Sequence, residues 1–269
     1  MSFARNSKRR RQNKGRFSFL FKVLAIAAVL AAMTLGATVF FQLQTVEVAG
    51  NSRYAAADVE AASGLQTGDN LFRINKYQIQ SDIREKLPYV ESVNIVRKLP
   101  STILITVTEW HAVANIQPTE FVSHSEEMDY SDKLTDENWL ISVGGKLLEQ
   151  APADSTAIRV SGLSAISPRA GTLLAVPQEQ QGKLDALLAL LEVLEAREVT
   201  PLISQADLTA PTQILLRYDE RFWIKLPMGG DFDYMIRALQ TVLPDWDGYE
   251  KGTFDLTRKD YPITFSPEG

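Results

Sequence analysis

Nineteen consecutive residues without a charged side chain, 23–41, constrain this chain more than any other stretch. As a helix rising ~1.5 Å per residue they extend about 28 Å, close to the hydrocarbon thickness of a bilayer. A buried core helix would show a polar face, but this segment carries only two threonines. A cleaved secretory signal usually has ~7–15 apolar residues before a small-residue cleavage site, whereas this stretch continues through Phe40 and Phe41. We therefore expect an uncleaved transmembrane helix over residues 23–43.

The charge distribution predicts which side of the membrane each part occupies. The net charge is −5 for the whole chain and +8 before Glu47, so the remainder carries −13. Excess Lys and Arg beside a span stays in the cytoplasm, which predicts a cytoplasmic tail over residues 1–22 and exported domains after it. The tail is polar enough that we expect residues 1 to about 16 to be unstructured. Topology alone explains these charges, so we expect no nucleic-acid partner.

There is no cysteine in the chain. An exported protein of this size must then rely on its hydrophobic cores, without disulfide bonds or thiol chemistry. This composition suits a bacterial extracytoplasmic protein.

Residues 44–110 have the pattern of a small α+β unit with the order β-α-α-β-β. In Thr102–Glu109, Ile103, Ile105 and Val107 alternate with threonines, which is typical of a half-buried strand. Asn75 followed by Gln78 resembles a capping box, and Pro88 should end the helix that begins there. The expected elements are strands 45–49, 90–97 and 102–109 and helices 55–63 and 76–87. Two helices can cover only one face of such a sheet.

These residues resemble a known family. The segments VEVAGN, SGLQTGDNLFRI and IREKLPYVESVNIVRKLPSTILITVTE are similar to a POTRA domain of the cell-division type. One such domain directly after a single span is the arrangement of the bacterial FtsQ/DivIB family. Tandem POTRA copies before a membrane barrel, typical of export or insertion machinery, are not visible in the sequence.

Residues 111–265 predict a mostly antiparallel β domain with two or more helices, followed by a short tail, 266–269. Seven acidic residues against one lysine make 117–138 an expected solvated insertion. The leucines of Gln178–Glu198 follow helical spacing, which favours packing on a sheet of the same domain over a partner-binding zipper. The segments WLISVGGKLLE, IRVSGL, TQILLRYDERFWIKLP and KGTFDLTRKDYPITF resemble, in this order, the carboxy-terminal β domain of FtsQ/DivIB. The expected strands are 139–148 as a hairpin, 158–163, 206–208, 212–218, 221–225, 253–257 and 263–265, with a second helix over 233–243.

No catalytic pattern stands out. The two histidines, His111 and His124, are too few for a zinc site, and no nucleophile or phosphate-binding motif is present. Nothing among the 33 acidic residues singles out a pair of carboxylates for glycan hydrolysis. We expect no enzyme activity, no metal, no cofactor and no small-molecule substrate. A membrane-anchored cell-wall enzyme would instead need a pocket with two close carboxylates.

The last strands are the expected binding site. Strand formers in 253–265 are interrupted by Arg258, Lys259 and Asp260, charges that keep a free sheet edge soluble. The family resemblance implies that the terminal strand docks FtsB, or DivIC in Gram-positive bacteria, with FtsL alongside. The contact positions implied are Asp255, Leu256, Thr257, Arg258, Tyr261 and Ile263. Leu256 and Ile263 also fit a role in core packing, and Arg258 and Tyr261 fit exposed contacts.

The resemblance implies a single-pass scaffold of the bacterial divisome in the cell membrane at the division septum. Its exported domains would bind FtsB/DivIC and FtsL and thereby assemble and regulate septal peptidoglycan synthesis. A POTRA-type chaperone of protein export or membrane insertion is the alternative. A partner site on the 90–109 hairpin rests on the resemblance alone.

Overall fold

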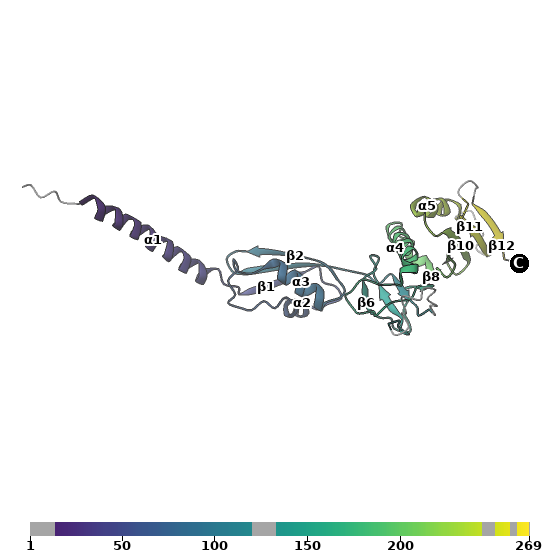
Figure 1. Ribbon diagram of the computed structural model, residues 1–269, viewed down its shortest axis with the longest axis horizontal. Coiled ribbons are helices and arrows are strands. Elements are labelled where there is room, and N and C mark those ends of the chain that lie inside the picture. The colour runs from purple at the N-terminus through teal and green to yellow at the C-terminus, as the bar shows by residue number, and fades with distance from the viewer. Residues whose placement is uncertain (1–13, 120–132, 244–250, 259–262, 269) are drawn as a thin grey trace, which may run out of the picture.

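Helix α1 (Lys14–Phe40) leads into two folded domains arranged along one long axis (Figure 1). The computed structural model describes residues 14–119, 133–243, 251–258 and 263–268. The window Phe19–Gly36 of α1 has a mean hydropathy of 2.2, and no part of it is buried by the rest of the protein. By length and composition α1 can cross a membrane. It also begins earlier than expected, because an apolar helix propagates cooperatively into flanking residues such as Lys14 and Arg16.

The small domain has the predicted order and a three-stranded sheet arranged β1-β3-β2. Strand β1 runs parallel to β3, and β2 runs antiparallel to it. Its elements are β1 (Thr45–Ala49), α2 (Ala56–Ser63), α3 (Lys76–Lys86), β2 (Val90–Lys98) and β3 (Thr102–Glu109). All five lie within a residue or so of the expected bounds, which confirms this part of the sequence analysis.

Local signals explain where the two helices of this domain begin and end. Gly64 adopts φ 68°, a left-handed conformation that ends α2. Asn75 accepts hydrogen bonds from the backbone N–H groups of Tyr77 and Gln78 at the start of α3. The side chain of Gln78 binds Asp82, so only one half of the expected capping box forms. Ile103, Ile105 and Val107 are all buried against the helices, as their alternation predicts.

The large domain is built on a nine-stranded sheet with the order β12-β11-β10-β9-β8-β7-β4-β5-β6. Three neighbouring pairs are parallel, namely β4–β7, β7–β8 and β10–β11, and the other five are antiparallel. Its strands are β4 (Ala114–Ile116), β5 (Trp139–Ile141), β6 (Leu147–Gln150), β7 (Ile158–Ser161), β8 (Ile203–Asp207), β9 (Gln213–Tyr218), β10 (Phe222–Pro227), β11 (Gly252–Asp255) and β12 (Thr264–Pro267). Its helices are α4 (Gln181–Ala196) and α5 (Phe232–Val242), with short 3-10 turns η1 (Gln178–Gln180) and η2 (Thr200–Leu202). Strand β12 thus continues two residues into the expected tail.

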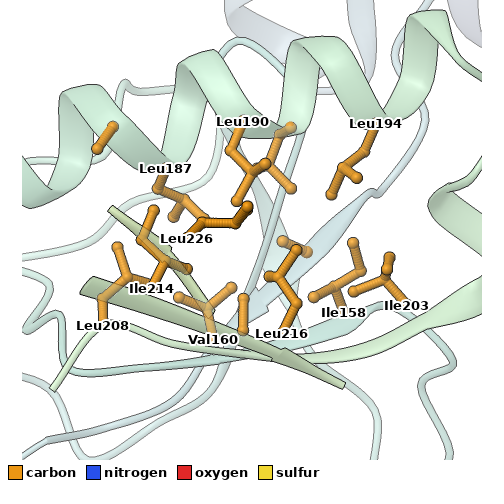
Figure 2. Packing of buried hydrophobic residues seen from close by; sticks show 14 of the residues in the cluster. Ile158, Val160, Leu187, Leu190, Leu194, Ile203, Leu208, Ile214, Leu216 and Leu226 are labelled. Atoms are coloured by element: carbon orange, nitrogen blue, oxygen red, sulfur yellow. The ribbon is translucent and has the colours of Figure 1, made fainter. Parts of the chain in front are cut away.

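The leucine stripe of α4 packs on this sheet. Leu187, Leu190 and Leu194 point toward the strands and are almost wholly buried (Figure 2). The side chains that they meet include Val160, Ile203, Ile214 and Leu216. Packing within the domain, and not a partner zipper, is therefore the role of this face.

Strand β4 was not predicted. It has only three residues, all buried, and lies between β5 and β7. A run this short shows no alternation that could distinguish it from a loop.

Candidate partner-binding edge

Strand β12 forms one end of the nine-stranded sheet and has β11 as its neighbour. The two strands are antiparallel, with Phe254 opposite Phe265 and Asp255 opposite Thr264. Beyond Pro267, Glu268 N–H still donates to the carbonyl of Lys251 at 2.9 Å. Strand β11 is enclosed between β10 and β12, so the margin available to another chain belongs to β12.

An aromatic cluster holds β12 in place. The ring of Phe265 lies 4.8 Å from that of Phe254 and 6.3 Å from that of Phe222. Phe222 and Phe254, themselves 5.2 Å apart, are fully buried. Offset and edge-to-face rings contribute beyond their buried area, so the cluster anchors the terminal strand to the core.

Gly252 allows β12 to lie close to β11. A Cβ atom at this position would overlap the backbone oxygen of Ser266 and the ring of Phe265. Any larger residue must therefore push β12 away from its partner strand. Sequence reasoning missed both Gly252 and Phe265; a glycine at the start of a terminal strand was the available signal.

The residues that follow β11 make a tight turn. The carboxylate of Asp255 accepts hydrogen bonds from the N–H of Thr257 at 2.9 Å and from its hydroxyl at 2.6 Å. The hydrogen bond from the Thr257 hydroxyl, together with its backbone bond and the charges of Lys225 and Arg258, lowers the pKa of Asp255 despite partial burial. Asp255 stays ionised, and Arg258 is exposed directly after the turn.

The remaining predicted positions divide between core and surface. Leu256 is 9% exposed and belongs to the core, one of the two roles expected for it. Its N–H donates to the carbonyl of Lys225 at 2.9 Å. Ile263 is half-buried against the same core. Tyr261 lies outside the described residues.

The opposite end of the sheet, at β6, is covered in part. Leu147 N–H donates to the carbonyl of Thr172, and Gly171 N–H donates to the carbonyl of Leu147, both at 2.8 Å. The segment 171–173 therefore occupies the start of the β6 margin. Among the two ends of the large sheet, β12 is the better candidate for pairing with another chain.

A polar cluster joins the two domains, and sequence reasoning did not anticipate it. The Arg53 guanidinium and the Tyr89 hydroxyl both donate to Oε1 of Glu149 at 2.7 Å, and Arg53 lies 3.8 Å from the centre of the Tyr89 ring. Burial, and then the hydrogen bond to Glu149, raises the pKa of Tyr89 far above its ordinary value. Lys146 donates to the carbonyl of Val90 at 3.1 Å. Tyr89 also packs on the buried side chains of Leu140 and Leu148, so the junction fixes the two domains relative to each other.

Within the described ranges, no group of three or more His, Cys, Asp or Glu side chains is arranged to hold a metal ion.

Comparison with known proteins gives a consistent assignment. Residues 41–110 match the model of the POTRA domain, FtsQ-type. The chain is 37% identical to cell division protein FtsQ of Corynebacterium glutamicum over 91 residues, which is 32% of this chain and 40% of that protein. It is 23% identical to cell division protein DivIB of Clostridium botulinum over 233 residues, 84% of this chain and 82% of that protein. Over 35% of its length it is 35% identical to FtsQ of Streptomyces venezuelae, covering 34% of that protein.

Proposed function

The chain belongs with the FtsQ and DivIB cell-division proteins of bacteria, and on that premise we propose that it is a single-pass scaffold of the divisome. It binds FtsB or DivIC, together with FtsL, through the outer margin of β12. It catalyses no reaction. By placing and restraining these partners it assembles and regulates septal peptidoglycan synthesis.

The observation that carries this proposal is the position of β12 at the end of the sheet, beyond an enclosed β11. A strand at a sheet end can accept an extended segment of another chain, whose main chain adds hydrogen bonds while alternate side chains enter neighbouring pockets. The aromatic cluster beneath β12 holds this margin rigid before the partner arrives, which reduces the entropy lost on binding.

The predicted contact residues take different parts in this proposal. Arg258, which is exposed after the turn that follows β11, supplies a charge for the partner, and Tyr261 supplies an aromatic contact. Asp255 and Thr257 shape the turn that presents Arg258. Leu256 and Ile263 act through the core that supports the strand.

The orientation follows from charge. The basic residues before the span remain in the cytoplasm. Both folded domains lie on the other side of the membrane, at the division septum. Helix α1 holds the scaffold in the cell membrane.

Co-purification tests this proposal. The full chain is expressed with tagged FtsB/DivIC and FtsL of the same organism, and the membranes are solubilised in detergent. Gly252→Val, which displaces β12, should reduce retention of the chain more than tenfold, because several interchain backbone hydrogen bonds of about 0.5–1.5 kcal/mol each are lost.

Gly182→Ala in α4 is the matched control, since a Cβ there meets no atom within 4 Å, and it should be retained like the parent chain. Deleting residues 264–269 should abolish retention while the large domain keeps its cooperative thermal transition. Undiminished retention of both the Gly252→Val chain and the deletion would contradict the assigned margin.

A further inference from the structure

The connection between α1 and the small domain contains no free linker. Helix α1 ends at Phe40 and β1 begins at Thr45. Leu71 N–H donates to the carbonyl of Phe41 at 2.9 Å, and Leu43 N–H donates to that of Asp69 at 2.8 Å. Leu43 itself is 1% exposed. The backbone leaving the span is therefore bonded into the domain at once, which fixes the domain against the end of α1.

Two loops lie at that end of the domain, the 68–74 loop and the turn between β2 and β3. Gln44 N–H donates to the carbonyl of Ser101 in this turn at 2.8 Å. The arrow of β2 points back toward α1, so its last residues lie beside the end of the helix (Figure 1). We call Phe72, Arg73, Lys98, Leu99 and Pro100 the membrane-facing end.

This end exposes large apolar side chains. Phe72 is 57% exposed and Leu99 is 56% exposed. The ring of Phe41 packs edge-on against both Phe40, at 5.2 Å, and Phe72, at 5.0 Å. A continuous row of aromatic rings thus runs from the end of the apolar helix onto the surface of the domain. Phe and Leu side chains at a membrane–water interface bury in the boundary between headgroups and acyl chains, because this removes their apolar surface from water.

Arg97 holds the 68–74 loop in the conformation that presents Phe72. Its guanidinium donates to the carbonyl of Leu71 at 2.6 Å and to that of Ile74 at 2.8 Å. Both acceptors flank the exposed residues Phe72 and Arg73. The loop therefore presents an exposed aromatic ring, whose apolar surface an interfacial environment would remove from water.

The charges at this end differ from those of the exported part as a whole. Arg73 is exposed, and Lys98 is half-exposed with its ammonium 2.6 Å from Glu47. Glu47 and Asp69 lie at the same end and offset two of the three charges of Arg73, Arg97 and Lys98, so this end is close to neutral while the residues from Glu47 onward carry −13 in total. Lys and Arg near a bilayer are attracted to anionic headgroups by about 1 kcal/mol each.

We propose that the membrane-facing end rests on the headgroup layer of the bilayer that holds α1, with Phe72 and Leu99 inserted at the interface and Arg73 among lipid phosphates. The proposal relies on α1 spanning the membrane and is independent of partner binding at β12. The short bonded connection supplies the argument for this occupant, because the domain cannot move away from the lipid surface without breaking those hydrogen bonds. Contact with the membrane would fix the tilt of both domains and hence the height of β12 above the bilayer.

The absence of cysteine permits a direct test with single labels. The full chain carrying Leu99→Cys, Pro100→Cys or Phe72→Cys is labelled with an environment-sensitive nitrobenzoxadiazole dye. Each protein is reconstituted without partners into nanodiscs of phosphatidylethanolamine and phosphatidylglycerol that contain a nitroxide-labelled lipid. Tyr234→Cys on α5, where the parent side chain is 60% exposed, is the matched control.

Dyes at 72, 99 and 100 should be quenched several-fold more strongly than the dye at 234 and should emit at shorter wavelength. Adding Arg73→Glu, or omitting phosphatidylglycerol, should lower the quenching at 99, which distinguishes an anionic lipid surface from nonspecific proximity. The proposal would be overturned if the dyes at 72, 99 and 100 were quenched as weakly as the dye at 234. It would also be overturned if strong quenching arose only after partner proteins were added. The Pro100→Cys chain keeps the side chains of Phe72 and Leu99. Strong quenching at 100 with weak quenching at 72 or 99 would therefore show that labelling those two side chains disrupts the membrane contact.

Discussion

Strand β2 ends the small sheet and β12 ends the large one, yet different groups lie beside the two strands. Side chains of α3 reach the edge of β2: Lys76 Nζ donates to the carbonyl of Ile95 at 2.6 Å, and Gln80 Nε2 donates to that of Val93 at 2.7 Å. Strand β12 has β11 on one side and lies beyond every other strand of the described sheet. Two carbonyl groups of β2 are thus already used within the small domain, which makes β12 the better candidate for pairing with another chain.

The two margins also differ in what supports them. The edge of β2 is held by hydrogen bonds from a helix, whereas β12 is held by the rings of Phe222, Phe254 and Phe265. Hydrogen bonds from α3 use the acceptors that a partner strand would need. The aromatic rings pack under the sheet and do not use the backbone N–H and C=O groups at the outer margin of β12. This margin is therefore supported and still available for backbone hydrogen bonds.

The largest effect should come from removing the support of β12. Phe222→Ala deletes a buried ring and should lower the free energy of unfolding of the large domain by about 3–5 kcal/mol. Phe72→Ala removes a ring that is 57% exposed and should cost the soluble fold about 0.5 kcal/mol or less. Thermal and denaturant unfolding of the full chain in detergent measures both. Equal losses would show that the aromatic cluster does not anchor the terminal strand.

Reversing the charge beside the β12 margin should have the next largest effect. Arg258→Glu should weaken partner binding by about 1–3 kcal/mol, because a charge-assisted hydrogen bond is replaced by repulsion. Arg169→Glu, at an exposed position far along the sheet, is the matched control and should bind normally. Titration at low salt gives the dissociation constants, and unchanged affinity for Arg258→Glu would remove this residue from the interface.

Removing the α3 side chains that lie beside the edge of β2 tests whether they protect this edge from pairing. The double substitution Lys76→Ala with Gln80→Ala removes both bonds to the β2 carbonyls and should destabilise the small domain by about 1–3 kcal/mol. It should also promote self-association through the exposed strand, seen in sedimentation velocity. A chain that remains monomeric at high concentration would mean that these side chains do not protect the edge.

The smallest effect concerns Glu109, which positions the domain junction. Its carboxylate accepts hydrogen bonds from the N–H and hydroxyl of Ser52 and from the N–H of Arg53, the residue that reaches Glu149. Burial alone would raise the pKa of Glu109, but the hydrogen bonds from Ser52, Arg53 and Tyr54 together lower it below the ordinary 4.5.

A lowered pKa gives this carboxylate a stabilising contribution that is fully present above pH 4.5 and is lost as the pH falls through the folded-state pKa. Glu109→Gln should therefore lower stability by about 1 kcal/mol near neutral pH and by less in acid. Stability curves of parent and variant that stay parallel down to pH 3 would contradict the assignment.

Sequence patterns were sufficient for the small domain because its elements are local. Alternation in 102–109, the cap at Asn75 and the glycine at position 64 each act within a few residues. The large domain depends on long-range pairing, and there prediction was less complete. Strand β4 was not predicted, because three consecutive buried residues show no hydrophobic periodicity. Strand β8 begins at Ile203, earlier than the expected Ala206.

The sequence predicted where the candidate edge lies but not all of the residues that form it. Strand propensity and interrupting charges indicated the last two strands, but not that Gly252 and Phe265 join them, since both act across the strand pair. The turn between β9 and β10 was predicted at Asp219 and Glu220, but its backbone conformation was not: both residues adopt positive φ, at 48° and 51°. The domain junction joins residues 53, 89 and 149, far apart in sequence, and no local signal reveals it.

Site-specific photocross-linking in dividing cells tests the central claim most directly. A benzophenone amino acid is placed in the full chain at Thr264 or Ser266 on β12, and at Asn94 on β2 for comparison; all three side chains are exposed. We predict cross-links to FtsB or DivIC from 264 and 266 and none from 94. Cross-links from 94 alone, or equal yields from both strands, would contradict the account.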